Sequence, residues 1–137
     1  MDKEIKSKQV VLIADDSSTV RKFVAFSLST ESLEVVTAVD GMDALEKISQ
    51  IPRVDLIIVD LNMPNMDGFE FIQNVRGSDT HGKVPIIILS SERGEEAKQR
   101  GKQVGANAYI EKPFDAKVIK YQVSKFLSLN YQRPTDV

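Results

Sequence analysis

The sequence predicts an α/β protein with three layers, in which five helices cover both faces of a single five-stranded parallel sheet. The first observation is that strand-length apolar runs alternate with helical patterns five times along the chain. The second is that three of those runs, over residues 10–14, 54–59 and 85–89, are apolar at almost every position. Such runs are typical of strands buried on both faces of a parallel sheet. Right-handed crossovers between the strands then give a doubly wound arrangement.

The length and composition suit one domain. The chain has 137 residues, of which 42% are hydrophobic, and its formal net charge is -2. Acidic and basic residues are interspersed, so no basic block indicates nucleic acid binding. With no cysteine, disulfides and thiol catalysis are excluded. The apolar runs are too short to span a membrane, and the first residues lack an apolar signal core. We therefore expect a soluble cytoplasmic protein with neither a nucleic acid nor a membrane as partner.

The first half of the chain supplies three strands and two helices. We expect the strands over residues 10–14, 33–39 and 54–59. Ser17 is one of several candidate N-caps for the helix after the first strand, and Phe23 lies on the apolar side of that helix. Asp40 and Gly41 open the second helix, which Pro52 closes off from the third strand.

The second half supplies two strands and three helices. Asp67 and Glu70 resemble a capping box, with Met66 and Phe71 in the positions of a hydrophobic staple, and the helix they start is expected to bury Phe69. The remaining elements are expected at residues 85–89 and 108–110 for strands and at 92–104 and 116–129 for helices. We divide the chain into a charged lead-in (1–8), one domain (9–129) and a polar, loose tail (130–137).

Polar side chains stand where the apolar runs end. Asp15 and Asp16 follow the first run, Asp60 the third, Ser90 the fourth and Lys112 the fifth. In doubly wound folds, ligands bind outside the carboxyl ends of the strands, so these five residues should meet at one edge of the sheet. The sequence therefore predicts a chemical site there.

The three carboxylates favour a hard divalent cation. Asp15, Asp16 and Asp60 offer only oxygen ligands, which suits magnesium, or manganese, better than zinc or copper. Without a cation, three carboxylates so close together would repel one another. Taken alone, the Asp15-Asp16 pair would be explained equally well as a helix cap. The addition of Asp60 and Lys112 makes the cation site the better interpretation.

Asp60 is the best placed nucleophile. A carboxylate can accept a phosphoryl group to form an acyl phosphate, and Lys112 would pair with one of the incoming oxygens. Ser90 offers a hydroxyl, and the backbone amides of Leu61, Asn62 and Ser91 are further candidate donors. Taken separately, Ser90 is most simply a turn residue. For Lys112-Pro113 alone, an ordinary turn and a functional signal explain the pair equally well.

Two other features keep two interpretations each, and a third has one. Tyr109, three residues before Lys112, is either a buried phenol or a surface aromatic. The basic residues of the helix from Glu92 are best explained as a solvated face unless a partner docks there. The single histidine, His81, falls in a loop, and we interpret it as incidental.

Together these residues resemble the receiver domains of bacterial response regulators, and most closely the single-domain chemotaxis regulators. The resemblance covers about residues 9–128 and rests on Asp15-Asp16, the segment 60–68, Ser90 and Lys112-Pro113. It implies a flavodoxin-like sheet with strand order 2-1-3-4-5, an order taken from the family. No output domain follows within the 137 residues, so we expect a stand-alone regulator that is a monomer or weak dimer.

The resemblance also implies a role for each site residue. Asp60 would take a phosphoryl group from a phosphohistidine on a partner histidine kinase. Asp16, Asp60 and the carbonyl of Asn62 would bind magnesium directly, with Asp15 acting through a water. Lys112 and Ser90 would contact the phosphoryl oxygens. The protein would be a switch, and not an enzyme acting on other substrates.

A coupled movement would transmit the signal. By the same resemblance, Ser90 would move toward the phosphoryl group and let Tyr109 turn inward, which would remodel the face formed by the fourth helix, fifth strand and fifth helix for a target protein. Many family members have threonine in place of Ser90, so the coupling is expected to be looser here. Asn62 and Glu92 stand where the family tunes water attack. Both are polar, which predicts a short-lived phosphoryl group, with or without a separate phosphatase.

Other functions fit the sequence less well. A haloacid-dehalogenase-type phosphatase would need an Asp-x-Asp-x-Thr motif, but serines stand two residues after Asp15 and Asp16. A silent adaptor with a receiver fold would not need the intact acidic residues and Lys112. A nucleotide-binding domain would need a glycine-rich loop after the first strand. A single-domain receiver in a phosphorelay outside chemotaxis remains the main alternative.

Overall fold

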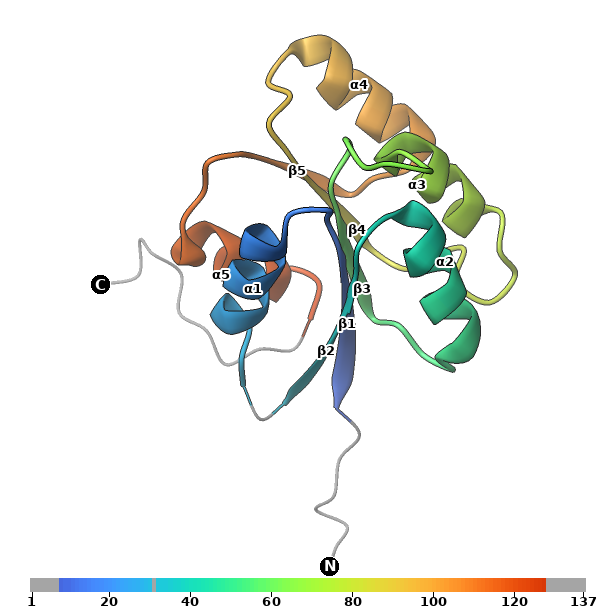
Figure 1. Cartoon of the computed structure of the whole chain (residues 1–137), viewed down its shortest axis with the longest axis vertical. Coiled ribbons are helices and arrows are strands. Elements are labelled where there is room, and N and C mark those ends of the chain that lie inside the picture. Colours follow the sequence, from blue (N-terminus) through green and yellow to red (C-terminus); the bar gives the residue numbers. More distant parts are fainter. Residues whose placement is uncertain (1–7, 31, 128–137) are drawn as a thin grey trace, which may run out of the picture.

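Helices and strands alternate along the chain (Figure 1). The structure is a computed structural model that describes residues 8–30 and 32–127. The strands are β1 (Gln9–Ala14), β2 (Leu33–Ala38), β3 (Leu56–Val59), β4 (Ile86–Ser90) and β5 (Ala108–Glu111). The helices are α1 (Ser18–Ser27), α2 (Gly41–Gln50), α3 (Gly68–Arg76), α4 (Glu95–Val104) and α5 (Ala116–Ser124). None of the helices in these two ranges has the length and hydropathy to cross a membrane.

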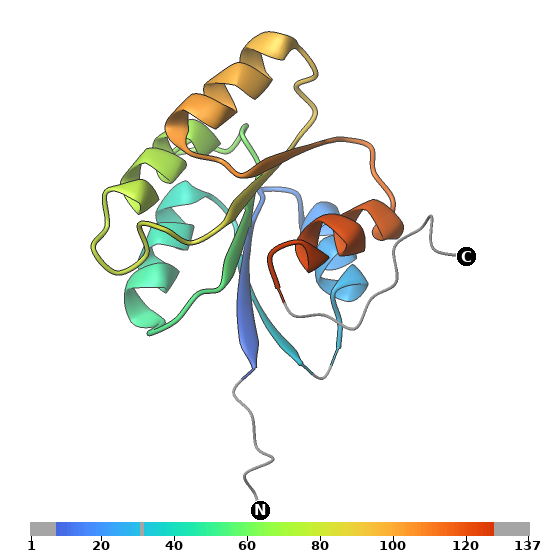
Figure 2. The ribbon, with the colours of Figure 1, turned by 180° about the vertical axis from the view of Figure 1, so that it is seen from behind.

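The five strands form one parallel sheet in the order β2-β1-β3-β4-β5, which confirms the predicted fold class and strand order. Helices α1 and α5 lie on one face, while α2, α3 and α4 lie on the other (Figures 1 and 2). After β1 the chain moves first to β2 at one edge, and then returns past β1 to β3 and the other edge. The carboxyl ends of β1 and β3 therefore flank the point where strand order reverses, and this is where such folds bind ligands.

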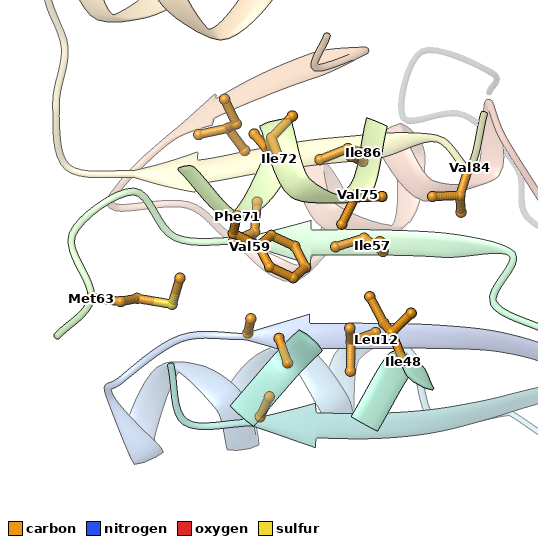
Figure 3. Packing of buried hydrophobic residues seen from close by; sticks show 14 of the residues in the cluster. Leu12, Ile48, Ile57, Val59, Met63, Phe71, Ile72, Val75, Val84 and Ile86 are labelled. Carbon is orange, nitrogen blue, oxygen red and sulfur yellow. The ribbon is translucent and has the colours of Figure 1, made fainter. Parts of the chain in front are cut away.

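The sheet separates two apolar cores. Alternate residues of β1, β3 and β4 point to opposite faces, because side chains alternate along a strand. On one face they pack with side chains of α2 and α3, among them Phe71 and Val75, which point toward β3 and β4 in Figure 3. On the other face they pack with α1 and α5 through side chains such as Val24 and Ile119, both fully buried. The strands are thus buried on both faces, as their apolar runs predict.

Polar caps begin four of the helices. The Oγ of Ser17 accepts a hydrogen bond from the amide of Val20, and the Asp67 carboxylate accepts one from the amide of Glu70. Asp40 and Asp115 cap α2 and α5 in the same way. Each oxygen satisfies an amide that has no partner within its own helix. The predicted starts of the first and third helices are therefore confirmed.

Several predicted boundaries are wrong by a few residues. The third strand begins at Leu56, because the Asp55 carboxylate accepts from the amide of Val10 at 2.7 Å and ends the ladder there. The second strand ends at Ala38, since the amide of Val39 donates to the Asp43 carboxylate of α2 instead. The fourth strand is displaced by one residue and includes Ser90.

The predicted bounds of the last two helices also need correction. The fourth helix begins at Glu95, not at residue 92, because the amide of Glu92 donates to the Oγ of Ser90 and holds residues 91–94 as a loop. The fifth helix ends at Ser124. The last two residues of the predicted helix, the polar tail and the lead-in before Lys8 lie outside the described residues.

Two aromatic side chains are more exposed than their helical positions indicate. Phe23 is 40% exposed and covers one side of Phe114, with 5.6 Å between the ring centroids. Phe69 is only partly buried, because it faces α4, where the Arg100 guanidinium lies 4.1 Å from the centre of its ring. Both residues face a neighbouring helix or loop that the periodicity of their own helix does not reveal.

Candidate functional site

Four of the predicted site residues meet at the carboxyl edge of the sheet. Asp15 and Asp16 follow β1, Asp60 follows β3 and Lys112 follows β5. One carboxylate oxygen from each of Asp15, Asp16 and Asp60 lies within 4.8 Å of the other two. Asp15 and Asp60 are buried while Asp16 is exposed, so the cluster is open to solvent on one side.

Lys112 places its ammonium between two of these carboxylates. Its Nζ lies 3.1 Å from Oδ2 of Asp15 and 3.6 Å from Oδ2 of Asp60. The peptide bond between Lys112 and Pro113 is cis. One positive charge cannot balance three carboxylates, so the site keeps an excess of negative charge. That excess and the all-oxygen donor set suit a hard divalent cation, and the three acidic residues can hold one.

The Asp15 carboxylate and carbonyl are both held in place. Its Oδ1 accepts a hydrogen bond from the amide of Ser17 at 2.9 Å, at the start of α1. Its backbone carbonyl accepts a second one from the guanidinium of Arg21 at 2.7 Å. The same turn that starts α1 therefore orients the acidic pair, so the capping interpretation and the site interpretation of these residues are compatible.

Asp60 is buried with a carboxylate neighbour. Its side chain is 6% exposed. Burial raises its pKa to about 6, and the Asp15 carboxylate adds to the increase. The Lys112 ammonium and the backbone amide of Asn62 act in the opposite direction, because both favour the charged form. The Asn62 amide is thus one of the expected donors that the structure places at Asp60, while the Asn62 side chain is exposed.

The backbone of Gly68 packs directly against the backbone of Asp60 and Leu61. Its amide donates to the carbonyl of Leu61 at 2.9 Å, which brings the start of α3 against the end of β3. A Cβ atom at this position would lie 2.4 Å from the carbonyl oxygen of Asp60 and 2.8 Å from the Cα of Leu61. Only glycine allows this approach of backbone to backbone. Sequence reasoning missed this role, because the glycine is simply the first residue of a helix.

Ser90, Glu92 and Tyr109 form a chain of contacts next to the carboxylates. Ser90 is fully buried, and its Oγ accepts a hydrogen bond from the amide of Glu92 at 3.1 Å. The Tyr109 hydroxyl donates to the carbonyl of Glu92 at 2.6 Å. Burial raises the pKa of Tyr109, while the nearby Ser90 hydroxyl lowers it. The Tyr109 ring packs beside Gly101 of α4 and joins the core cluster on that face. In this structure the ring is therefore partly buried against α4, and the hydroxyl is held by the loop before α4.

Two ion pairs connect α4 and the loop before it to β5. The carboxylate of Glu111 accepts from Lys98 of α4 at 2.6 Å and lies 3.6 Å from the guanidinium of Arg93. Arg93 also donates to the backbone carbonyl of Lys112 at 2.7 Å. The start of α4 is thus joined to β5 and to Lys112, which follows it. Sequence reasoning missed Arg93 and Arg21, since both act on carbonyls that only the folded chain brings near.

Comparison with known proteins supports the predicted family. The model of the family described as "Response regulator receiver domain" matches residues 11–124. The chain belongs to this family. Members of this family act as phosphoacceptor switches in two-component signalling, and the match extends from within β1 to the end of α5.

Individual relatives agree with the family match. The receiver domain is 34% identical to chemotaxis protein CheY1 of Helicobacter pylori over 88% of the chain and 98% of the relative. It is 36% identical to protein PilG of Pseudomonas aeruginosa over 76% of each. The solved structure of chemotaxis protein CheY4 of Vibrio cholerae superimposes with a TM-score of 0.83 at 40% identity, covering 88% of this chain and all of that one. The protein is thus a CheY-like response regulator receiver.

Proposed function

We propose that Asp60 of this receiver domain accepts a phosphoryl group from a phosphohistidine on a partner histidine kinase. The observation that supports this most directly is the position of the Asp60 carboxylate, buried at the end of β3 with the Lys112 ammonium 3.6 Å away. Asp15 lies closer to the ammonium, at 3.1 Å, but its other carboxylate oxygen is bonded to the amide of Ser17. Asp60 is therefore the more available nucleophile.

The transfer is a displacement at phosphorus. An oxygen of the Asp60 carboxylate forms a bond to phosphorus while the bond from phosphorus to the imidazole nitrogen breaks, and its electron pair returns to that nitrogen. The product is an acyl phosphate on Asp60. Lys112 pairs with one phosphoryl oxygen, and the Ser90 hydroxyl, which is next to the site, donates to another.

The acidic cluster fits a magnesium ion, with manganese as a substitute. Asp15, Asp16 and Asp60, together with the carbonyl of Asn62, would hold the ion. When bound, the ion would supply positive charge against the negative charge of the carboxylates and the incoming phosphoryl group. The residues alone leave that charge uncompensated, since Lys112 provides one positive charge for three carboxylates.

The output surface is the face formed by α4, β5 and α5. Ser90 is fully buried at the end of β4, which pairs with β3, and its Oγ and the Tyr109 hydroxyl both bond to Glu92. A Ser90 hydroxyl that turns to a phosphoryl oxygen would release the amide of Glu92, so phosphorylation would change the loop that Tyr109 holds. This change would select one of two packings of the face, and a target protein would bind one of them.

The pathway we propose is chemotaxis. The names of the Helicobacter pylori and Vibrio cholerae relatives support it. A phosphorelay outside chemotaxis is the second candidate. Asn62 and Glu92, both exposed at the rim of the site, are proposed to tune the rate of dephosphorylation, by the protein itself or with a phosphatase. A cytoplasmic location and a monomeric or weakly dimeric state stay predictions.

Incubation with acetyl phosphate and Mg²⁺, followed by intact mass measurement, tests the proposal. We expect the mass to increase by one phosphoryl group, and hydroxylamine to remove it, as it does from acyl phosphates. Asp60→Asn should lose the modification. Asp67→Asn is the matched control, because it changes a nearby exposed carboxylate that caps α3 and keeps an oxygen that can cap. Full modification of the Asp60→Asn variant would contradict the assignment.

A further inference from the structure

A cavity of about 400 Å³ lies at the opposite edge of the sheet, where the strands begin. It opens between the last turns of α2 and α3 and the loops that lead into β3 and β4. The apolar part of its wall includes Ile48, Ile51 and Val75. Figure 3 shows Ile48 and Val84 toward this end of the strands, away from the edge that carries Met63. The volume lies within the range of small-molecule sites.

His81 is a buried polar group in the wall of this cavity. Only 9% of the residue is exposed. Its backbone is fixed, because its amide donates to Oγ of Ser78 at 3.1 Å and its carbonyl accepts from the amide of Val84 at 3.2 Å. Within the described ranges, 8–30 and 32–127, its imidazole makes no hydrogen bond or ion pair. The interpretation of His81 as an incidental loop residue does not explain this burial.

Three other polar side chains of the wall, those of Ser49, Asn74 and Ser78, are already paired, while Thr80 is exposed to solvent. Oγ of Ser49 donates to the carbonyl of Glu46 at 2.6 Å, and the amide of Asn74 donates to the carbonyl of Glu70 at 2.9 Å. Oγ of Ser78 accepts from two backbone amides of its own loop. Buried polar groups in native proteins almost always have a partner, so the unpaired imidazole indicates that something else satisfies it.

We propose that this cavity binds a small neutral molecule with an aromatic body and one hydroxyl group, with the hydroxyl paired to His81. The apolar walls suit an aromatic ring. A neutral imidazole has one donor and one acceptor, and a hydroxyl can bond to either nitrogen. No Asp, Glu, Lys or Arg is among the described residues that line the cavity, so a charged ligand would lose its hydration without compensation.

The proposed site is separate from phosphorylation. Asp60 follows the carboxyl end of β3, whereas Pro52 and His81 precede the amino ends of β3 and β4. Binding in the cavity is therefore expected to occur equally in the Asp60→Asn variant. If no ligand binds in the cavity, this result therefore leaves the proposed phosphoryl transfer to Asp60 unaffected, and the reverse also holds.

Titration with 2-naphthol, followed by NMR of the histidine ring, tests the proposal. His81 is the only histidine of the chain, so the ring ¹H–¹³C signals belong to one residue. We expect saturable shifts, and about a tenfold loss of 2-naphthol affinity in His81→Phe, measured by calorimetry. Naphthalene has no group that can hydrogen-bond to the imidazole, so its weaker binding should not change with His81→Phe. Circular dichroism confirms that the variant folds.

A second variant tests the position of the ligand. Ser49 is exposed on α2 and lines the cavity, so Ser49→Trp should fill the opening without disturbing the core and abolish binding. Binding of 2-naphthol at unchanged affinity to Ser49→Trp would show that the ligand lies elsewhere. Absence of saturable shifts in the wild-type protein would mean that water alone occupies the cavity. Equal affinity of His81→Phe and wild type for 2-naphthol would also overturn the proposal.

Discussion

The Lys112 ammonium lies 3.6 Å from the Asp60 carboxylate while its closer partner, at 3.1 Å, is Asp15. The lysine is thus held by a carboxylate other than the proposed phosphoryl acceptor. A phosphoryl group on Asp60 would bring oxygens to which the same ammonium can turn. Lys112 is therefore positioned to respond to the modification, and Asp15 keeps it near the site beforehand.

Lys112→Ala should weaken the response to phosphorylation more than it weakens metal binding. The alanine removes the group that would pair with a phosphoryl oxygen but leaves all three carboxylates in place. The measurements are Mg²⁺ affinity and the chemical shift change of the Tyr109 amide with beryllofluoride. Lys120→Ala, an exposed lysine on α5, is the control. A full beryllofluoride response with unchanged Mg²⁺ affinity would contradict the role given to Lys112.

Asp60→Asn should stabilise the metal-free protein at neutral pH. The pKa of Asp60 is raised to about 6 in the folded state, above its ordinary value near 4. Between these two values the folded state binds more protons than the unfolded state, so stability falls as the pH rises through that window. Asparagine does not titrate, so the variant does not lose this stability as the pH rises. We expect the free energy of unfolding of the variant to exceed that of wild type by about 1–3 kcal/mol at pH 7.

Urea denaturation in EDTA at several pH values measures this difference. The advantage of Asp60→Asn should shrink as the pH falls through about 6 and be lost below about 4, where the wild-type carboxyl group is protonated in both states. A difference that stays constant over this range would mean that the stabilisation has a cause other than the charge of Asp60.

Added Mg²⁺ should raise the melting temperature. A cation that binds only the folded state at a concentration about 100 times its dissociation constant stabilises it by about 2.7 kcal/mol. For a chain of this size that corresponds to an increase of roughly 5–10 °C. Asp16→Asn should lose most of the increase, whereas Asp79→Asn, an exposed residue in the loop after α3, should keep it. An equal increase in both variants would place the ion outside the acidic cluster.

Gly68→Ala should destabilise the protein and disturb Asp60. The added Cβ would lie 2.4 Å from the carbonyl oxygen of Asp60, so the start of α3 must move away from β3. We expect a loss of about 1–3 kcal/mol, typical of overpacking, together with slower phosphorylation. Gly77→Ala is the matched control, because a Cβ there has ordinary contacts at 3.6 Å. Equal denaturant midpoints for Gly68→Ala and Gly77→Ala would contradict the close approach of Gly68 to Asp60.

Tyr109→Phe should loosen the loop before α4. The phenylalanine keeps the ring against Gly101 but loses the hydrogen bond to the Glu92 carbonyl at 2.6 Å, at a cost of about 0.5–1.5 kcal/mol. Amide hydrogen exchange over residues 91–95 should be faster. The same substitution at Tyr121, on α5, leaves that loop untouched and should not change its exchange. Unchanged exchange in Tyr109→Phe would remove the phenol from the proposed coupling.

Much of this architecture follows from local patterns. The runs 10–14, 54–59 and 85–89 are apolar at almost every position, which is typical of interior strands, and their alternation with helical segments leaves few topologies. The strand order itself came from the family resemblance, because an apolar run predicts a buried strand but does not indicate which strand pairs with it. The boundaries predicted at residues 39, 54 and 92 were wrong because the amides of Val39, Val10 and Glu92 bond to the side chains of Asp43, Asp55 and Ser90.

By itself the sequence determined the fold class and the meeting of Asp15, Asp16, Asp60 and Lys112, because the carboxyl ends of parallel strands share one edge. Only the tertiary structure decided how tightly these residues are held. The approach of Gly68 to Asp60, the hydrogen bond from Tyr109 to Glu92 and the burial of His81 each depend on contact between separate elements. Such contacts are set by packing between distant parts of the chain, which leaves no local pattern in the residues themselves.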